Sequence, residues 1–149
     1  MPKDISYDYI RGLVDSEGCF TFHTVPGRVG SGFDKMKVPA FAISMHERDE
    51  DMINSIRDKL GLRNRVYNFK PYLADGFNRG RKVTLCVRDL GSLKNIIIPL
   101  FYDKFIGHKS KQFLSWLEEI GTNPAVPESY RLLYRLHKSG FYSSNKKYL

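Results

Sequence analysis

The feature that most constrains the fold is a pattern of hydrophobic spacing that occurs twice along the chain. Apolar residues recur at helical intervals and then alternate with polar residues over two short segments, as in a half-buried strand pair. The first unit is a helix from about Asp4 or Ser6 to Ser16, with strands at 19–25 and 38–45. The second is a helix at 49–60 with strands at 65–69 and 82–88, and helical patterns follow at 90–98, 109–120 and 128–137.

This element order, αββαββα, predicts an α+β fold. Four antiparallel strands form one sheet, and the helices cover one of its faces. The opposite face is then open to a partner, although a shift of one residue in register would exchange the two faces. The side chains that we expect to face the helices are Phe20, Phe22, Phe41, Ile43, Val66, Val83, Leu85 and Val87.

The length of 149 residues suits a single domain, with a core at about 5–120 and a C-terminal helix and basic, mobile tail at 121–149. Its net charge of +8 is unevenly distributed. Residues 1–62 hold 8 Lys or Arg against 10 Asp or Glu (−2), whereas residues 63–149 hold 16 against 6 (+10). A basic half of this kind favours a polyanionic partner such as nucleic acid.

Several other classes of protein are disfavoured by the sequence. Cys19 and Cys86 lie in separate predicted strands, and the four histidines lack metal-binding spacing. The longest apolar run, 96–102, is short and contains Pro99, so no membrane association is expected. Without a signal-peptide pattern at the N-terminus, we expect an intracellular, reducing location: a bacterial or archaeal cytoplasm or an organelle interior.

The segment YIRGLVDSEGCF at residues 9–20 resembles the signature of the LAGLIDADG homing endonucleases. Arg11 and Ser16 stand at the two alanine positions of the signature, and Glu17 replaces its second aspartate. The resemblance covers roughly residues 5–120 and includes the order of helices and strands. The signature is matched, or conservatively replaced, at Ile10, Gly12, Leu13, Val14, Asp15 and Gly18.

The resemblance implies a site-specific endonuclease with a saddle-shaped sheet that cuts double-stranded DNA at a long, near-palindromic target, as in intron homing. A single copy of the motif implies a homodimer, in which the helices of two subunits meet across a two-fold axis. Gly12 and Ser16 lie on one helical face and would permit a close approach, with Asp15 also at this interface. Glu17 of each subunit would then lie beside the same DNA phosphates.

The catalytic residues implied by the resemblance are Glu17, Lys109 and His46. Glu17 and the Ser16 carbonyl are expected to bind Mg²⁺, for which Mn²⁺ can substitute. Lys109 matches a lysine of the family that lies near the attacking water, with Lys111 or Lys104 as alternatives. Met45 stands where the relatives have a glutamine, so either His46 or Arg48 must serve there, or the site is altered.

A larger set of residues is expected to contact DNA. Side chains on the open sheet face would read bases in the major groove, and basic loop residues would contact phosphates. Any one of the basic loop residues, taken singly, could instead be an exposed charge that only favours solubility. The set comprises Thr21, His23, Arg28, Lys35, Lys37, Ser44, Arg65, Tyr67, Lys70, Arg79, Arg81, Lys82, Thr84, Arg88 and Lys111.

The alternative function is that of a relative that binds nucleic acid with weak or no cleavage. Such a protein would be an intron RNA-splicing maturase or a DNA-binding regulator, and RNA is expected as a partner only in this case. The retention of Glu17 argues against this alternative, whereas Met45 argues for it.

Overall fold

The computed structural model describes residues 4–27, 29–30, 32–71, 73–144 and 147–148, and it contains the two predicted units of a helix and a hairpin. The first unit consists of α1 (Tyr7–Glu17), β1 (Gly18–Pro26) and β2 (Lys35–His46). After a short 3₁₀ turn, η1 (Glu47–Asp49), the second consists of α2 (Glu50–Leu60), β3 (Val66–Phe69) and β4 (Lys82–Val87). The predicted αββαββ order is therefore confirmed.

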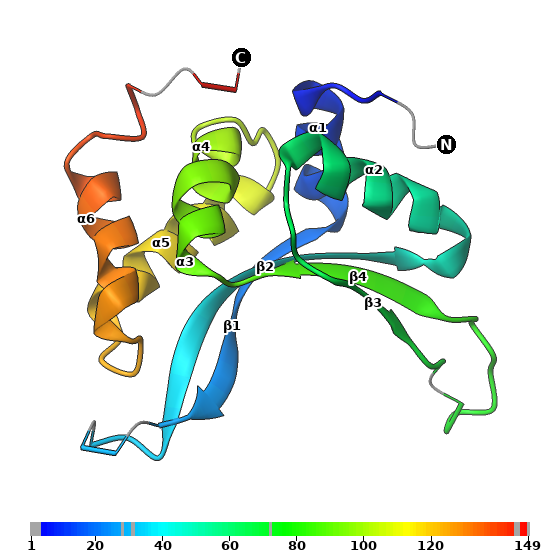
Figure 1. Cartoon of the computed structure of the whole chain (residues 1–149), viewed down its shortest axis with the longest axis horizontal. Helices are drawn as coiled ribbons and strands as arrows, with labels where there is room; N and C mark the ends of the chain where they lie inside the picture. The colour runs from blue at the N-terminus through cyan, green and yellow to red at the C-terminus, as the bar shows by residue number, and fades with distance from the viewer. Residues whose placement is uncertain (1–3, 28, 31, 72, 145–146, 149) are drawn as a thin grey trace.

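The four strands form one antiparallel sheet in the order β1-β2-β4-β3. Ala42 lies opposite both Cys19 and Cys86, and Ser44 lies opposite Thr84. These five side chains therefore share one face of the sheet. The helices lie above the sheet, and the tips of its two hairpins splay apart on the side away from the helices, so the underside is open and concave (Figure 1). The predicted helix-facing side chains are buried or partly buried in the core.

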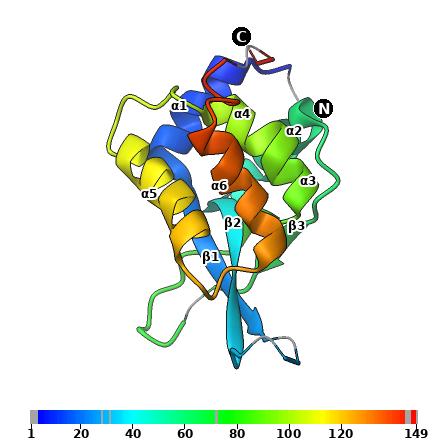
Figure 2. The ribbon, with the colours of Figure 1, turned by 90° about the vertical axis from the view of Figure 1, so that its left-hand side faces the viewer.

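The C-terminal part of the chain extends the helical layer. It contains α3 (Leu90–Ser92), a π-helical turn η2 (Leu93–Ile97), α4 (Ile98–Phe101), α5 (Lys109–Thr122), η3 (Glu128–Tyr130) and α6 (Arg131–Lys138). Helices α5 and α6 pack side by side at one end of the molecule (Figure 2). The run that begins at Leu90 continues three residues beyond the predicted end at Ile98. Pro99 has no amide to donate, and the wide π turn just before it changes the hydrogen-bond register.

The two ends of α1 are fixed by small residues. Ser6, one of the two predicted caps, accepts a hydrogen bond from the Tyr9 amide at 3.0 Å. Gly18, although a glycine at the end of a helix can take the left-handed conformation, does not do so here: its φ of −81° and ψ of 165° lead the chain directly into β1. Glycine is needed there for space instead, because an added Cβ would lie 2.5 Å from Val14 Cγ1.

The C-terminal segment packs against α1, which explains a departure from the family signature. Arg11 is buried, donating through Nε to the Leu100 carbonyl at 2.8 Å and through Nη2 to the Tyr148 carbonyl. Tyr142 and Tyr148 directly flank residues 143–147, the tail that we expected to be mobile, and both are buried in the core. An arginine at the signature's alanine position therefore holds the end of the chain in place.

Candidate functional site

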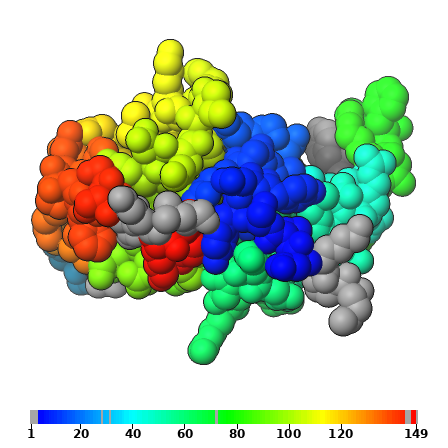
Figure 3. Space-filling model, turned by 90° about the horizontal axis from the view of Figure 1, so that it is seen from above, coloured from blue at the N-terminus to red at the C-terminus, as the bar shows by residue number. Residues whose placement is uncertain are grey.

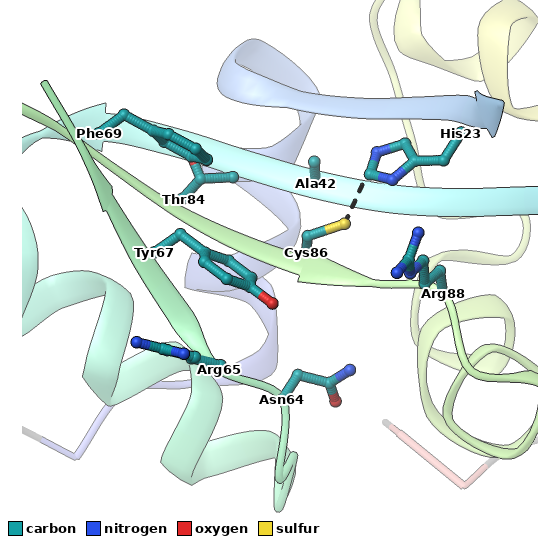
Figure 4. A pocket seen from close by; sticks show the side chains of 9 residues that line it. All are labelled: His23, Ala42, Asn64, Arg65, Tyr67, Phe69, Thr84, Cys86 and Arg88. Carbon is teal, nitrogen blue, oxygen red and sulfur yellow. Dashed lines mark hydrogen bonds between the residues drawn. The ribbon is translucent and has the colours of Figure 1, made fainter. Parts of the chain in front are cut away.

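The concave underside of the sheet presents polar side chains, and a hollow of about 460 Å³ lies on it. We call this the sheet hollow (Figure 4). Ser44 and Thr84, at the centre of the sheet, share a hydrogen bond of 2.7 Å. His23 Nε2 lies 3.8 Å from Cys86 Sγ, and burial raises the pKa of this thiol. The hollow is lined by His23, Ala42, Asn64, Arg65, Tyr67, Phe69, Thr84, Cys86 and Arg88.

A second hollow, of about 700 Å³, adjoins the C-terminus of α1 and is here called the Glu17 hollow. A single carboxylate, that of Glu17, lines this hollow together with a set of cationic side chains from β4 and the loop between β3 and β4. One of these, Arg79, also forms a 2.7 Å ion pair with Asp75, and its hydrogen bond lowers the pKa of that carboxyl. The basic side chains in the lining are Lys70, Arg79, Arg81 and Lys82.

The end of α1 suits a divalent cation. Glu17 is exposed, and the last carbonyls of the helix carry the negative end of its dipole. The Phe20 amide, which a longer helix would direct to the Ser16 carbonyl, donates instead to Gln112 Oε1 at 3.2 Å. Hard oxygen donors of this kind match Mg²⁺, which takes few protein carboxylates and completes its shell with water and phosphate. Within the described residues no three His, Cys, Asp or Glu side chains cluster in a way that could hold a metal ion.

Lys109 is the predicted catalytic lysine that the structure places beside Glu17. Its Nζ donates to the Gly18 carbonyl at 2.5 Å, from the first turn of α5. Lys104 and Lys111, the two alternatives, are exposed, and like Lys109 they are not among the described residues that line either hollow. What distinguishes Lys109 is its hydrogen bond to the carbonyl next to Glu17.

His46 occupies the end of β2 at the edge of the Glu17 hollow. Its Nδ1 accepts a hydrogen bond from the Arg48 amide at 3.1 Å. Its Nε2 packs against Gly80, where an added Cβ would lie 2.4 Å away. Met45 also lines this hollow but is packed against the core. At this end of β2, His46 rather than Met45 shares the outward face with Ser44.

The model of the LAGLIDADG endonuclease family matches residues 10–120. The chain belongs to the LAGLIDADG endonuclease family. The matched region runs from α1 into α5 and contains the whole sheet, both hollows and Lys109. No curated protein matches the sequence closely enough to count as a relative.

Solved structures of homing endonucleases share this LAGLIDADG fold. I-TnaI, a homing endonuclease, is 20% identical with a TM-score of 0.58, covering 92% of this chain and 99% of its own. I-LtrWI bound to target DNA is 20% identical with a TM-score of 0.63, and the match covers 99% of this chain and 46% of I-LtrWI. I-SmaMI bound to uncleaved DNA in the presence of calcium ions is 21% identical with a TM-score of 0.62, and the match covers 89% of this chain and 45% of I-SmaMI. This chain thus spans almost all of I-TnaI but under half of the other two.

The LAGLIDADG helix, α1, has a face that no other part of the described chain covers. Gly12 and Ser16 are exposed, and Tyr9 on the same face is 48% exposed. In Figure 3 this helix reaches the edge of the molecule between the segment that leads into α5 and the loop between β3 and β4. Asp15 Oδ2 accepts hydrogen bonds from the amides of Ile106 and Gly107 at 3.1 and 3.2 Å. Its Oδ1 is buried and has no hydrogen-bond partner among the described residues.

Not every predicted DNA-contacting residue lies at the two hollows. Lys35 and Lys37 are exposed in β2, but the strand alternation places them on the same side as Phe41, opposite to Ser44. Arg28 lies outside the described residues. Thr21, in β1, is half-buried and pairs with Ala40 near the sheet hollow. The remaining predicted contacts, Lys111 excepted, line one hollow or the other.

Phe69 lines both hollows and was missed by the sequence analysis, as were Asn64 and Cys86 in the sheet hollow. Phe69 follows Tyr67 at the two-residue spacing of one strand face. This alternation was a sufficient signal for Phe69. Asn64 lies in a loop before β3, where periodicity does not predict the direction of a side chain.

The described helices include none long and apolar enough to cross a membrane.

Proposed function

We propose that this protein is a homing endonuclease that binds a long, near-palindromic site in double-stranded DNA as a homodimer and cleaves both strands with Mg²⁺. Mn²⁺ would substitute in the same donor set. The observation that carries the proposal is the Glu17 carboxylate, which is exposed at the end of the LAGLIDADG helix and opens into a hollow lined by basic side chains. Cationic walls suit DNA phosphates, and a single acidic group among them suits a metal ion.

Each group at this site has a role that follows from its position. Glu17 and the Ser16 carbonyl would hold Mg²⁺, which supplies an activated water and stabilises the oxygens of the phosphodiester undergoing hydrolysis. Lys109, held at the Gly18 carbonyl, is placed to offset negative charge that develops on the phosphate. His46 would orient solvent at the edge of the hollow, in place of the glutamine found in relatives. Arg79, like the other basic residues of the hollow, would hold the phosphates in position.

The homodimer is supported by the exposed face of α1. Gly12 has no neighbouring atom within 4 Å of an added Cβ, so a second helix has room to approach closely here. Asp15 Oδ1 is buried without a hydrogen-bond partner among the described residues, which is costly in an isolated chain, and a donor from a second subunit would relieve the cost. Two such chains would bring together two Glu17 carboxylates, where one subunit has a single one.

Cleavage of a randomised double-stranded DNA library with Mg²⁺, with sequencing of the cut ends, tests the proposal. We expect a long consensus with two-fold symmetry. Glu17→Gln should abolish cutting and leave DNA binding nearly intact, since one oxygen donor loses its charge while the basic surface is unchanged. Glu50→Gln, an exposed glutamate in the first turn of α2, is the matched control and should cut normally. Cutting by Glu17→Gln at the wild-type rate would refute the metal-binding role.

The second candidate is a nucleic-acid-binding relative without cleavage, acting as a DNA-binding regulator or an intron RNA-splicing maturase. The observation that favours it is Met45, whose thioether at the Glu17 hollow is a weak acceptor and cannot order a water as a glutamine does. In the library experiment this candidate predicts selective binding with no cut ends. Selective binding of structured RNA in place of duplex DNA would indicate the maturase.

A further inference from the structure

Exposed apolar side chains gather at the β3 side of the concave face, and the proposed cleavage reaction uses none of them. In β3, Tyr67 is 45% exposed and Phe69 is 51% exposed, and in the loop that follows Leu73 and Phe77 are also exposed. β3 is an edge strand of the sheet. Exposed apolar groups on an edge strand favour unwanted association unless a partner covers them. Such a cluster therefore indicates a contact surface.

The Tyr67 ring has a neighbour on each of its faces, which leaves its edge free. The centroids of Tyr67 and Phe69 are 6.1 Å apart with an angle of 25° between the rings, and the Arg65 guanidinium lies 5.5 Å from the Tyr67 centroid. Arg65 directly precedes β3, and the three side chains are spaced two residues apart, so the Tyr67 ring lies between the other two (Figure 4). A base between the two aromatic rings would need two stacking distances, about 6.8 Å in total. An unpaired base therefore does not fit between them.

Ring edges suit the edges of paired bases. In the major groove the C5-methyl group of thymine is the distinctive apolar group, and Phe, Ala and the Thr methyl contact it. Thr84 lies directly opposite Tyr67, and Ala42 also lines the sheet hollow, so small apolar groups stand beside the aromatic pair. The apolar surface exposed at this point is chemically suited to contact a methyl group.

The charges around the pair favour DNA over an apolar peptide. Lys82 lies directly opposite Phe69 on β4, and Arg65 and Arg88 line the same hollow as the rings. An apolar strip with cations on both sides is complementary to a groove of duplex DNA, in which base edges lie between two rows of phosphates.

We propose that Tyr67 and Phe69 are specificity-determining residues that select thymine, through its C5-methyl group, in each half of the DNA target. This inference rests on the proposed function, because it names the bases that the same DNA-binding face reads. It predicts that the half-site positions contacted by β3 are A·T pairs with thymine on the strand that faces these rings.

Replacement of thymine by deoxyuridine tests the inference, because it removes only the methyl group and preserves the base pairing. A target is first selected by the wild-type protein from random duplex DNA in Ca²⁺, and each thymine is then replaced in turn. Burial of one methyl group predicts about a fourfold loss of affinity at the contacted thymine. Phe69→Ala and Tyr67→Ala should bind the two versions of the target more nearly equally. Phe141→Ala, an exposed aromatic residue after α6, is the control and should keep the fourfold preference.

Each other outcome overturns the inference in a distinguishable way. Selective DNA binding in which no thymine is sensitive to loss of its methyl group would refute the inference and leave the proposed function intact. The same holds if Phe69→Ala and Tyr67→Ala, with wild-type melting temperatures, keep the full preference. If the protein selects no duplex sequence, both proposals fail. Tight binding of single-stranded RNA that Phe69→Ala weakens would show that the rings stack on unpaired bases instead.

Discussion

At the scale of single residues, the site depends on a few atoms fixed by backbone contacts. Lys109 is held by the Gly18 carbonyl, one residue beyond Glu17, and His46 is confined between the Arg48 amide and Gly80. Both side chains are therefore largely positioned before DNA arrives. A preorganised donor costs no reorganisation during the reaction, which is why such groups contribute strongly to catalysis.

The position of Lys109 leads to a prediction about the cleavage rate. Lys109→Gln should slow DNA cleavage by about 100-fold, the scale of losing one preorganised donor, with nearly unchanged DNA affinity. Single-turnover cleavage and a gel-shift titration measure the two quantities separately. Lys111→Gln, on the same helix but exposed, is the control. If Lys111→Gln were the slower variant, Lys109 would be the wrong assignment.

The residues that sequence analysis could identify are those of the signature and its nearest neighbours. The position of Glu17 and Ser16 at the end of a helix was predictable, because a glycine and a strand follow directly, whereas their proposed role came from the resemblance. Lys109 was identified only through the resemblance, since its contact with Gly18 joins positions 91 residues apart. The burial of Arg11 was not predictable, because its partner Tyr148 lies at the other end of the chain.

At the scale of elements, α3 illustrates how a short helix is fixed at its start. Asp89 Oδ2 accepts a hydrogen bond from the Ser92 amide at 3.0 Å, and Oδ1 accepts one from Asn64 Nδ2 at 2.9 Å. Burial acts to raise the pKa of this carboxyl, but the hydrogen bonds from Ser92 and Asn64 outweigh it, and the net pKa is lowered. The same contacts tie the loop before β3 to the start of the C-terminal helices.

Loss of this cap should destabilise the fold. Asp89→Ala should lower the free energy of unfolding by about 1 kcal/mol at pH 7. Since the folded pKa lies below the ordinary value of 3.8, the charge contributes stability above that pH, and the contribution is lost as the pH falls through the folded pKa. Urea unfolding at pH 7 and pH 3 should thus show a smaller difference between wild type and Asp89→Asn at pH 3. A difference in unfolding free energy that is larger at pH 3 than at pH 7 would contradict the role of the Asp89 carboxylate as the cap.

The elements themselves were largely predictable from periodicity, and the exceptions have physical causes. The strand at β2 begins three residues earlier than expected, because Lys35, Met36 and Lys37 pair with β1 despite their weak alternation. The helical run beyond Ile98 contains Pro99, which sequence rules treat as a stop. Tertiary packing of Leu100 and Phe101 in the core overrides that local signal.

At the scale of the whole molecule, the proposal requires two subunits to form one complete site. The concave sheet, the basic hollow and the Glu17 carboxylate belong to one chain, and Glu17 is the one acidic residue among the described residues that line this hollow. The exposed face of α1, with Gly12 and Ser16, provides the surface across which a second carboxylate would be brought in. The central claim is therefore that cleavage of both strands needs Glu17 from two subunits.

A subunit-mixing experiment tests this claim most directly. Wild-type protein and Glu17→Gln are co-refolded in equal amounts, and double-strand cleavage is measured with DNA in excess over protein. If each active unit needs two intact subunits, random pairing leaves about one quarter of the dimers active, and cleavage falls to about one quarter of that of the all-wild-type sample. A fall to only one half would show that each chain cuts independently, and it would contradict the shared site.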